Sequence, residues 1–570
     1  MTTATAGKTS GGIAGLVRFM TAAKAPTLPI NLSAVVGALV AVITQSVAWS
    51  LPFMLIALLL LAGQWRGAKA GQVEIGTLVV PRVAILLALA VLALARDTSD
   101  AALLAAVVLA VLAATLEPTL AAVARAGYPV TSNLPGLRTS PGRIRLMSWV
   151  PPINGAVVAV VLIAALTPLP GWPALVAALG GLAALAVAGL RGLQTALARR
   201  RAEGKLRSVL TSYEPVFAVY WQAAAGTSYQ LGMWLPYLER LGKPFIVVVR
   251  TRVNFDEAVA LTTAPVVLRT ALTDLDDVIV PSLKTVFYMN NAIRNCHMVR
   301  YEHLTHIQLN HGDSDKAPSY NPVFRMYDKN FVAGQAAVDR FAANGVSMPA
   351  EMFAIVGRPQ VEGITLARGP ISALADPTVL YAPTWAGFHA DSNYCSLPVG
   401  YDIIKALLAR GATIVFRPHP YAANSPALAR ECDRIRGLLA EDRKSTGRAH
   451  RFGTEAEKTM SVTDCFNVSD AMVSDVSSVV ADYLYSEKPF AMVSVLTPAA
   501  EFPKEFPLAR ASYVIDAHRK RLQGLDASLD EMLGSDPLAE TRRSLKRYYL
   551  GDFPAESYAQ RFVDEASRYV

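Results

Sequence analysis

Cysteine is scarce in this chain of 570 residues and shows no pairing pattern. The four cysteines are Cys296, Cys395, Cys432 and Cys465, and no two of them form a CxxC pair. Disulfide frameworks and zinc sites both use recurrent, closely spaced cysteines, so this spacing argues against either. We therefore expect free thiols in a reducing compartment, and we assign neither a metal site nor a cofactor.

Acidic residues are scarce in the first third of the chain. Residues 1–207 contain 17 Lys/Arg and 5 Asp/Glu, a net charge of +12, whereas the remainder contains 37 and 40, a net charge of −3. A nucleic-acid-binding protein needs its basic face on the folded polar domain, which this distribution does not provide. The basic excess instead suits loops beside an anionic membrane surface.

The first third is dominated by apolar runs with few charges. A bilayer is crossed by about 20 apolar residues, and several of these runs are shorter. We predict about six transmembrane helices, with four spans as the alternative. No short apolar stretch ends in a small-residue cleavage site, so the first run is expected to be retained. The runs span residues 27–43, 47–64, 77–95, 101–116, 150–167 and 173–190.

Charges in the loops predict an orientation. Alternate loops carry 16 basic residues on one side and 1 on the other. The positive-inside rule then places the N-terminus and everything after residue 191 in the cytoplasm. No run carries a charge at its centre, which disfavours a transporter. The region is either an anchor or a surface that holds a lipid-linked substrate, and the sequence does not separate these.

From Ser208 onward, short β-branched runs alternate with helical stretches. This pattern predicts parallel sheets covered by helices on both faces. About 360 residues exceed one such sheet, so we predict two Rossmann-like halves, 208–350 and 351–570, after a membrane region of residues 1–207. The predicted strands are Val216–Tyr220, Phe245–Val249, Val278–Pro281, His306–Asn310, Phe331–Ala333, Ala354–Gly357, Val379–Ala382, Thr413–Arg417, Ala471–Ser474 and Phe490–Ser494.

The segment His306–Lys316 runs from a predicted strand into a loop. A histidine such as His311 at a strand end can act as a general base near neutral pH. Gly312 lets backbone approach a ligand closely, and Lys316 would neutralise a phosphate. A plain turn built from Gly, Asp and Ser is the alternative.

Asp313 and Asp315 lie in the same loop. Two neighbouring carboxylates can bind a divalent metal, but we favour a solvated acidic turn. The other histidines, including His450, have no motif around them and are expected to be ordinary surface or core residues.

A second histidine, His419, lies between two prolines at the end of the predicted strand Thr413–Arg417. The prolines stiffen the backbone and fix the imidazole, as catalysis requires. Arg417 offers a guanidinium fork to a phosphate. At the end of the predicted strand Val379–Ala382, Thr384 would contact a phosphate and Trp385 would line the pocket. Structural roles are equally open for both residues.

The segment Ala471–Tyr483 reads as a strand, a hydroxyl-rich loop and a helix start. The N–H groups of a helix start and nearby serine hydroxyls bind anions, so Ser477 and Ser478 are the best phosphate donors. Ser474 and Asp475 complete the predicted substrate-binding set. A plain helix cap explains Asp475 equally well.

Four motifs follow one another along the chain: HG-then-Lys, YAPTW, RPHP and SDVSS. Together they resemble the CDP-glycerol glycerophosphotransferase family of teichoic-acid backbone synthesis. The N-terminal membrane region is additional to that resemblance. The resemblance covers roughly residues 210–570. It implies a GT-B fold with the donor bound by the C-terminal half, which ends in a helix. It also implies that His311 and His419 are the catalytic pair and that Ser477 and Ser478 hold the donor pyrophosphate.

These observations predict an enzyme in the cell membrane that transfers glycerol phosphate, or a related polyol phosphate, from a CDP-alcohol to a lipid-linked acceptor and releases CMP. Two alternatives remain. One is a GT-B glycosyltransferase that uses a nucleotide sugar, and the other is a non-catalytic membrane scaffold. Retention of both histidines and the serine loop argues against the scaffold.

Overall fold

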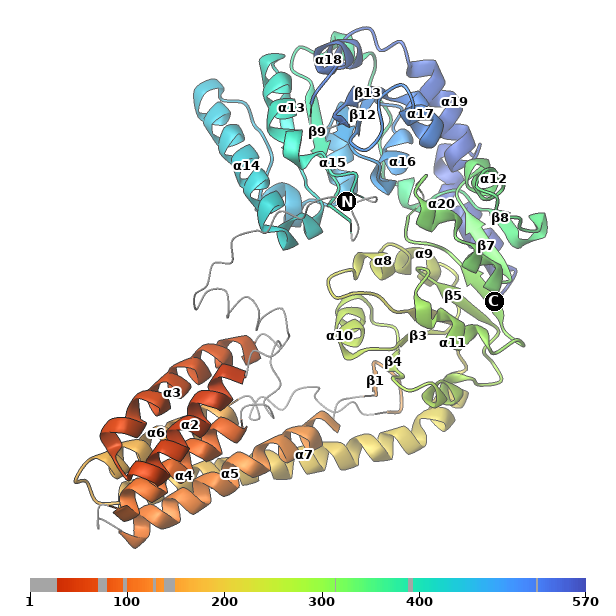
Figure 1. Cartoon of the computed structure of the whole chain (residues 1–570). Coiled ribbons are helices and arrows are strands. Elements are labelled where there is room, and N and C mark those ends of the chain that lie inside the picture. Colours follow the sequence, from red (N-terminus) through yellow and green to blue (C-terminus); the bar gives the residue numbers. More distant parts are fainter. Residues whose placement is uncertain are drawn as a thin grey trace, which may run out of the picture. The chain divides into compact units, whose positions relative to one another are not determined.

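The structure is a computed structural model that describes residues 28–69, 79–95, 100–126, 130–137, 149–312, 314–387, 393–518 and 521–570. The chain forms two compact units. One comprises Met1–Val130 and Gly136–Leu206, and the other comprises Thr131–Pro135 and Arg207–Val570. The first is helical and the second is α/β (Figure 1).

Each of the six apolar runs forms a helix, as the sequence predicts. Within the described residues, two helices, α5 and α7, are long and apolar enough to cross a membrane. Helices α2, α4 and α6 have 17 residues each, about 25 Å at the α-helical rise, which is short of a bilayer core. The six helices are α2 (Leu28–Thr44), α3 (Val47–Lys69), α4 (Val79–Ala95), α5 (Ala101–Ala126), α6 (Val150–Leu166) and α7 (Trp172–Tyr213).

A buried polar cluster lies inside the helical unit, where the sequence analysis placed no charge. Arg82 Nη1 of α4 is 2.7 Å from Glu117 Oε2 of α5, and Asn154 Nδ2 of α6 donates to the same oxygen at 2.9 Å. All three side chains are buried. The sequence analysis missed this cluster, because Arg82 lies near the start of the run 77–95 and Glu117 lies just past the end of the run 101–116. Both residues are within helices, so the argument against a transporter from missing charges is wrong.

The α/β unit contains two sheets. The first has eight strands in the order β1-β4-β3-β2-β5-β6-β7-β8, and the described pairings are parallel except that of β1 with β4. Its strands are β1 (Thr131–Ser132), β2 (Phe217–Trp221), β3 (Phe245–Val249), β4 (Val266–Leu268), β5 (Thr285–Tyr288), β6 (Thr305–Gln308), β7 (Lys329–Val332) and β8 (Phe353–Ile355).

The second sheet has five parallel strands in the order β10-β9-β11-β12-β13. Alternate residues of β9 face opposite sides: Val379 and Tyr381 pack in a core with α13 and α14, and Leu380 packs in a core with α16. Both faces are therefore covered, as near-continuous apolar strands require. The strands are β9 (Thr378–Ala382), β10 (Thr413–Phe416), β11 (Ala471–Ser474), β12 (Phe490–Ser494) and β13 (Tyr513–Asp516), and the helices are α13 (Leu397–Ala409), α14 (Pro426–Thr446) and α16 (Ser478–Leu484).

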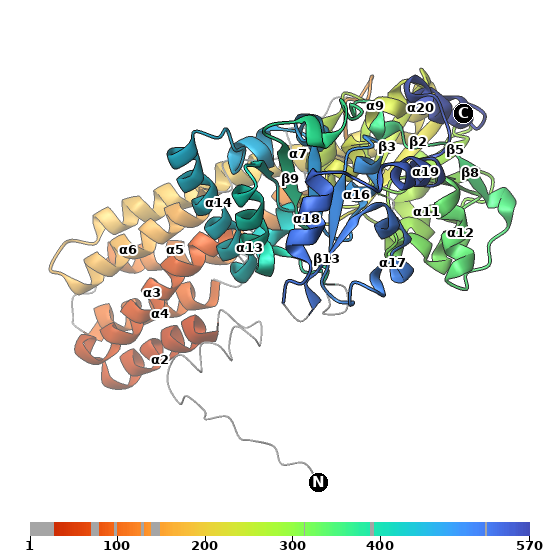
Figure 2. The ribbon, with the colours of Figure 1, turned by 90° about the horizontal axis from the view of Figure 1, so that it is seen from above.

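The end of the chain returns from the second half to the first. Helix α20 (Tyr558–Ser567) contacts α9 (Leu235–Glu239) of the first half. The ring of Phe562 lies 5.2 Å from that of Trp234, centroid to centroid. Figures 1 and 2 both show α20 beside the first half. Two parallel-sheet halves joined in this way form a GT-B-like α/β unit.

Two details differ from the sequence expectations. The predicted strand Val278–Pro281 is wrong, because the chain forms a 3-10 helix at Thr273–Val278 and the next strand is β5. Strand β8 belongs to the first sheet although it lies beyond residue 350, so the second sheet begins at β9. Strands β1, β4, β5 and β13 were not predicted.

Candidate functional site

The two halves meet where Gly312 approaches Ser478. A Cβ placed on Gly312 would lie 2.9 Å from both Cβ and Oγ of Ser478, closer than real Cβ atoms allow. Only glycine therefore permits this approach. The approach joins the loop after β6 to the start of α16, two segments that the sequence predicted to share one site.

His311 is held in a hydrogen-bonding state suited to accepting a proton. Its Nδ1 is buried and has no hydrogen-bond partner among the described residues. Burial, followed by the positive charge of Arg358, lowers the pKa of His311 to about 4, and the Met289 backbone opposes this shift. The imidazole is therefore neutral at pH 7, with an Nδ1 unpartnered by any described residue.

His419 is held in the complementary state. Its Nδ1 accepts the Tyr421 backbone N–H at 3.1 Å, so the neutral ring carries its proton on Nε2. Trp385 stacks on the ring with a centroid distance of 6.1 Å and an interplanar angle of 29°. Burial and then the charge of Lys316 lower the pKa of His419 to about 4. The ring is thus a neutral N–H donor at pH 7, rather than a cation.

Lys316 connects the loop after β6 electrostatically to the second half. Its charge acts on His419 and on Asp475, and its Nζ lies 5.0 Å from the centroid of the Tyr394 ring. Burial lowers the pKa of Lys316, and Asp475 opposes this shift. Lys316, on the loop after β6, consequently lies near His419 and Asp475 of the second half.

Asp475 is fully buried at the end of β11. Its Oδ2 accepts the backbone N–H groups of Thr384 at 2.7 Å and Ser396 at 3.1 Å, and its Oδ1 has no hydrogen-bond partner among the described residues. Burial raises the pKa of Asp475 to about 6, although these bonds and Lys316 oppose the shift. Asp475 therefore fixes the loop that carries Thr384.

The remaining predicted residues divide into two groups. Ser474 Oγ donates to the Ala382 carbonyl at 2.7 Å and ties β11 to β9. Arg417 Nη1 donates to the carbonyls of Ala456 and Met460, so its guanidinium holds the chain's own backbone. Ser477 is the N-cap residue of α16 and makes no side-chain capping bond. Its hydroxyl and that of Ser478 remain the predicted anion donors.

Arg358 is a site residue that the sequence analysis missed. It is 4% exposed, and its charge acts on His311. Its Nε is 2.8 Å from Asp482 Oδ1 and its Nη2 is 3.2 Å from Oδ2, which joins the segment after β8 to α16. The only sequence signal is its position directly after Gly357, shortly beyond a strand.

Asp315 connects the His311 loop to the second half. Its carboxylate accepts hydrogen bonds from the Tyr549 hydroxyl at 2.9 and 3.1 Å, and from the Leu508 backbone N–H at 3.1 Å. Arg340 Nη2 lies 3.1 Å from the same carboxylate. Asp315 therefore links the His311 loop to the second half by hydrogen bonds and is not a solvated turn residue.

Two other expectations concern metal binding and the spare histidines. Asp313 lies outside the described residues. In the described ranges, no group of three or more His, Cys, Asp or Glu side chains is arranged to hold a metal ion. His450 is a core residue: its Nδ1 accepts the Ile414 N–H at 2.9 Å and its Nε2 lies 2.8 Å from Asp442.

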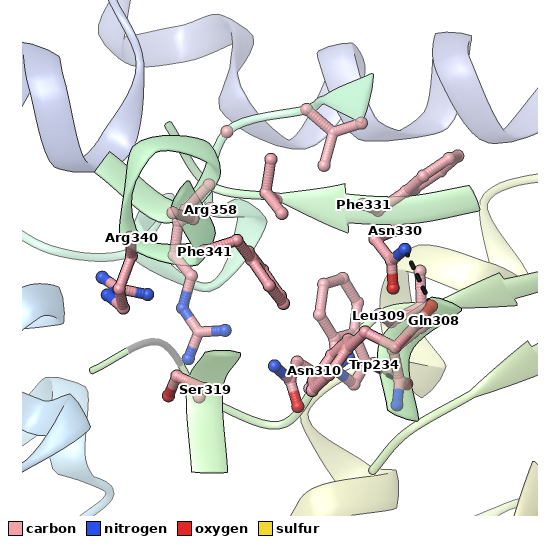
Figure 3. A pocket seen from close by; sticks show the side chains of 17 residues that line it. Trp234, Gln308, Leu309, Asn310, Ser319, Asn330, Phe331, Arg340, Phe341 and Arg358 are labelled. Atoms are coloured by element: carbon pink, nitrogen blue, oxygen red, sulfur yellow. Dashed lines mark hydrogen bonds between the residues drawn. The ribbon is translucent and has the colours of Figure 1, made fainter. Parts of the chain in front are cut away.

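A pocket opens beside Gly312, on the first half (Figure 3). Its lining includes Gln308 and Asn330 from neighbouring strands, together with Trp234 and Phe331. Arg358 also lines it. The pocket is therefore lined by Gly312, the residue after His311, and by Arg358.

The family model described as CDP-Glycerol:Poly(glycerophosphate) glycerophosphotransferase matches residues 368–495. This stretch contains the strand ends that carry Thr384, His419 and Ser477. The chain is therefore a glycerophosphotransferase-like transferase in this segment. No relative is found among the curated proteins.

Solved structures show a distant likeness. The wall teichoic acid polymerase TagF is 15% identical with a TM-score of 0.39, over 65% of this chain and 93% of that one. A putative UDP-N-acetylglucosamine 2-epimerase from Listeria monocytogenes is 12% identical with a TM-score of 0.42, over 62% and 96%. These values are too low to bear on the activity of this chain.

Proposed function

We propose that the protein transfers glycerol phosphate, or a related polyol phosphate, from a CDP-alcohol to a lipid-linked acceptor, with release of CMP. The family match over residues 368–495 supports the donor class. The observation that carries the proposal is the approach of Gly312 to Ser478, which brings the His311 loop to the predicted pyrophosphate site. An acceptor and a donor held on opposite halves would meet there.

The proposed reaction is a displacement at phosphorus. The acceptor hydroxyl oxygen attacks the β-phosphorus of the CDP-alcohol while its proton moves to His311 Nδ1. The bond from that phosphorus to the bridging oxygen breaks, and CMP leaves with the electron pair. Such transfers depend mainly on positioning and charge neutralisation.

The second half supplies the groups that stabilise phosphate charge. His419 Nε2–H donates to a phosphate oxygen, and the hydroxyls of Ser477 and Ser478 hold the pyrophosphate. Lys316 adds a positive charge from the first half. Arg358 adds a further positive charge beside His311, but its guanidinium is held by Asp482, as that of Arg417 is held by the Ala456 and Met460 carbonyls.

The helical unit is proposed to place the reaction at the membrane. Helices α5 and α7 have the length and apolarity of spans, and large apolar side chains also face outward. Leu59 is 73% exposed, Val108 65% and Leu190 62%. A helix that is apolar on all sides is typical of membranes. The loop charges favour a cytoplasmic α/β unit, where the cytosolic nucleotide donor would be available.

The test is a donor panel. Purified protein in lipid is incubated with CDP-glycerol, CDP-ribitol and several nucleotide sugars, and the released nucleotide is identified. CMP from a CDP-alcohol is the expected product. A nucleoside diphosphate from a nucleotide sugar would replace the proposal with a glycosyltransferase, and no turnover of any donor by folded protein would favour the scaffold.

A further inference from the structure

Tyr229 lies beyond the carboxyl end of β2 and belongs to none of the four sequence motifs. It begins the short helix α8 (Tyr229–Gly232). The strand order reverses between β2 and β5, and open parallel sheets bind ligands beyond such a switch point. The Tyr229 ring meets the His311 ring edge-on, with 6.3 Å between centroids and an interplanar angle of 73°. Because Tyr229 is 51% exposed, a large part of it stays open to a ligand beside His311.

The surrounding framework fixes the position of Tyr229. The Gln230 N–H donates to the Thr227 carbonyl at 3.0 Å. The Gln230 side chain is 8% exposed, and its Oε1 accepts Asn290 Nδ2 at 2.7 Å. Since Asn290 lies just after β5, this bond fastens the start of α8 to the neighbouring strand. The contact between Tyr229 and His311 is therefore built into the first half.

A second tyrosine, Tyr421, has a similar place on the second half. Its ring lies edge-on to that of His419, with 5.4 Å between centroids and an interplanar angle of 75°. It also packs edge-on against Trp385, with 5.2 Å between centroids. The negative charge of an ionised Tyr421 would raise the pKa of Tyr229, so the two phenols are near enough to interact. Tyr229 therefore lies between His311 and a residue that contacts His419.

The Tyr229 phenol keeps its proton at neutral pH. Partial burial raises its pKa, Gln230 opposes this shift, and Tyr421 raises the pKa further. A protonated phenol is an uncharged O–H donor. During phosphoryl transfer, negative charge spreads over three oxygens of the moving group, and donors placed around it stabilise that charge. His419 and the serines would approach from the second half, which leaves the side nearer His311 for a donor from the first half.

We propose that Tyr229 is a further residue of the active site, whose O–H donates a hydrogen bond to the phosphoryl group as that group passes from CMP to the acceptor. The inference rests on the proposed function and adds a donor from the first half to it. Tyr229 keeps its proton throughout, and the proton of the acceptor hydroxyl still moves to His311. The contact is made in the transition state, so its loss should change kcat more than KM.

The test is steady-state release of CMP from CDP-glycerol by Tyr229→Phe, which keeps the ring against His311 and removes only the hydroxyl. Loss of a hydrogen bond to a charged group is expected to lower kcat about 10–10²-fold, with KM for CDP-glycerol within about threefold of wild type. Tyr401→Phe is the matched control, because Tyr401 is a half-buried tyrosine of α13 whose ring faces Arg434. This control should have wild-type kcat.

A sulfur substitution shows whether the hydroxyl contacts the phosphoryl group itself. In the β-phosphorothioate of CDP-glycerol, sulfur replaces one non-bridging oxygen, and sulfur is a weak hydrogen-bond acceptor. With one of the two diastereomers, wild type should lose its advantage and react within about threefold of the Tyr229→Phe rate. A purely structural hydroxyl would give the same ratio of wild type to variant with oxygen and with both sulfur donors, and that result would overturn the proposal.

Two other results would also overturn it. Wild-type kcat in Tyr229→Phe, with a loss only in Tyr229→Ala, would mean that the ring packs against His311 and that the hydroxyl takes no part. A change confined to KM would make Tyr229 a group that binds the donor before the reaction. Absence of CMP release by wild type is a different outcome, because it would reject the proposed function and this contact with it.

Discussion

The two halves of the α/β unit each place a histidine just after a strand, and the Nδ1 atoms of the two rings differ. In the first half, the His311 Nδ1 is buried without a hydrogen-bond partner among the described residues. In the second half, the His419 Nδ1 accepts the Tyr421 backbone N–H, so the neutral ring carries its proton on Nε2. We therefore propose that His311 accepts a proton and that His419 donates a hydrogen bond.

The surroundings of the two rings differ in the same direction. The loop of the first-half ring continues into Gly312, which lines a pocket with apolar walls. The second-half ring stacks on Trp385 and is acted on by the charge of Lys316. We propose that the acceptor binds the first half and the donor the second, and each prediction below can break or sharpen that division.

The largest expected effect is loss of either ring. His311→Ala should lower CMP release about 10²–10⁴-fold, because general acid–base groups contribute on that scale. His419→Ala should lower it about 10²–10³-fold, the scale for loss of one donor to a transition-state oxygen. The measurement is the initial rate with CDP-glycerol, with circular dichroism to show that the variants fold. His303→Ala is the matched control, since His303 is exposed; near-wild-type turnover by either site variant would show that its ring is structural.

Substitution of each histidine by glutamine distinguishes a proton acceptor from a hydrogen-bond donor. Its amide supplies an N–H donor but no proton-accepting lone pair at nitrogen. His419→Gln should retain at least about tenfold more activity than His419→Ala, whereas His311→Gln should resemble His311→Ala. The reverse pattern would exchange the roles of the two halves.

A smaller effect is expected from the point where the halves touch. Gly312→Ala introduces a Cβ 2.9 Å from Ser478, so the loop or α16 must shift. Misplacement of reacting groups by about 1 Å can cost about 10²-fold, and a loss up to that size is expected in kcat. Gly363→Ala is the control, because its new Cβ would lie 3.4 Å from Thr463 Cγ2, an ordinary contact, and this variant should have wild-type kcat. Equal kcat for the two variants would show that the close approach of Gly312 to Ser478 does not matter for catalysis.

Asp315→Asn tests the hydrogen bonds that hold the first-half loop to the second half. The change weakens the bonds from Tyr549 and Leu508, and should lower the free energy of unfolding by about 1–3 kcal/mol. Urea unfolding followed by tryptophan fluorescence measures this. Asp339→Asn, which removes an exposed carboxylate bonded to Tyr548, should change it by less than about 0.5 kcal/mol. Equal effects would show that Asp315 does not join the halves.

The stability of the protein should also change with pH. Both histidine pKa values are lowered to about 4, so the folded state binds protons less readily than the unfolded state. Their contribution is complete above pH 6.5 and is lost as pH falls toward 4. Asp475 acts in the opposite direction, because burial raises its pKa to about 6. Its contribution to the stability of the folded protein is lost as pH rises from 3.8 to 6.

The measurement is the urea midpoint at several values between pH 4 and 7. The double variant His311→Gln with His419→Gln should show a midpoint that falls less than that of wild type on acidification. An unchanged pH profile would mean that the two rings are not held neutral by burial.

The strand ends were predictable because buried parallel strands are short apolar runs followed by polar loops. His311, His419 and Ser478 were all placed from that pattern. The direction in which each side chain points was not predictable. The pattern places Arg417 at a strand end, but its guanidinium donates to the Ala456 and Met460 carbonyls. Which atoms a side chain reaches depends on segments that are distant in sequence.

The errors have similar physical causes. The run Val278–Pro281 and the true strand Thr285–Tyr288 are both short and apolar, and periodicity does not choose between them. Arg358 was missed because its partner Asp482 is 124 residues away. The pair Arg82–Glu117 was missed because Arg82 lies near the start of one apolar run and Glu117 just past the end of another, and only packing of the two helices brings them together.

The most direct test of the division between halves is the affinity for CDP-glycerol, measured by calorimetry without acceptor. We predict that His311→Ala binds the donor within about twofold of wild type, and that His419→Ala and Ser478→Ala bind it at least about tenfold more weakly. Equal weakening by His311→Ala, or unchanged affinity in both second-half variants, would contradict the account.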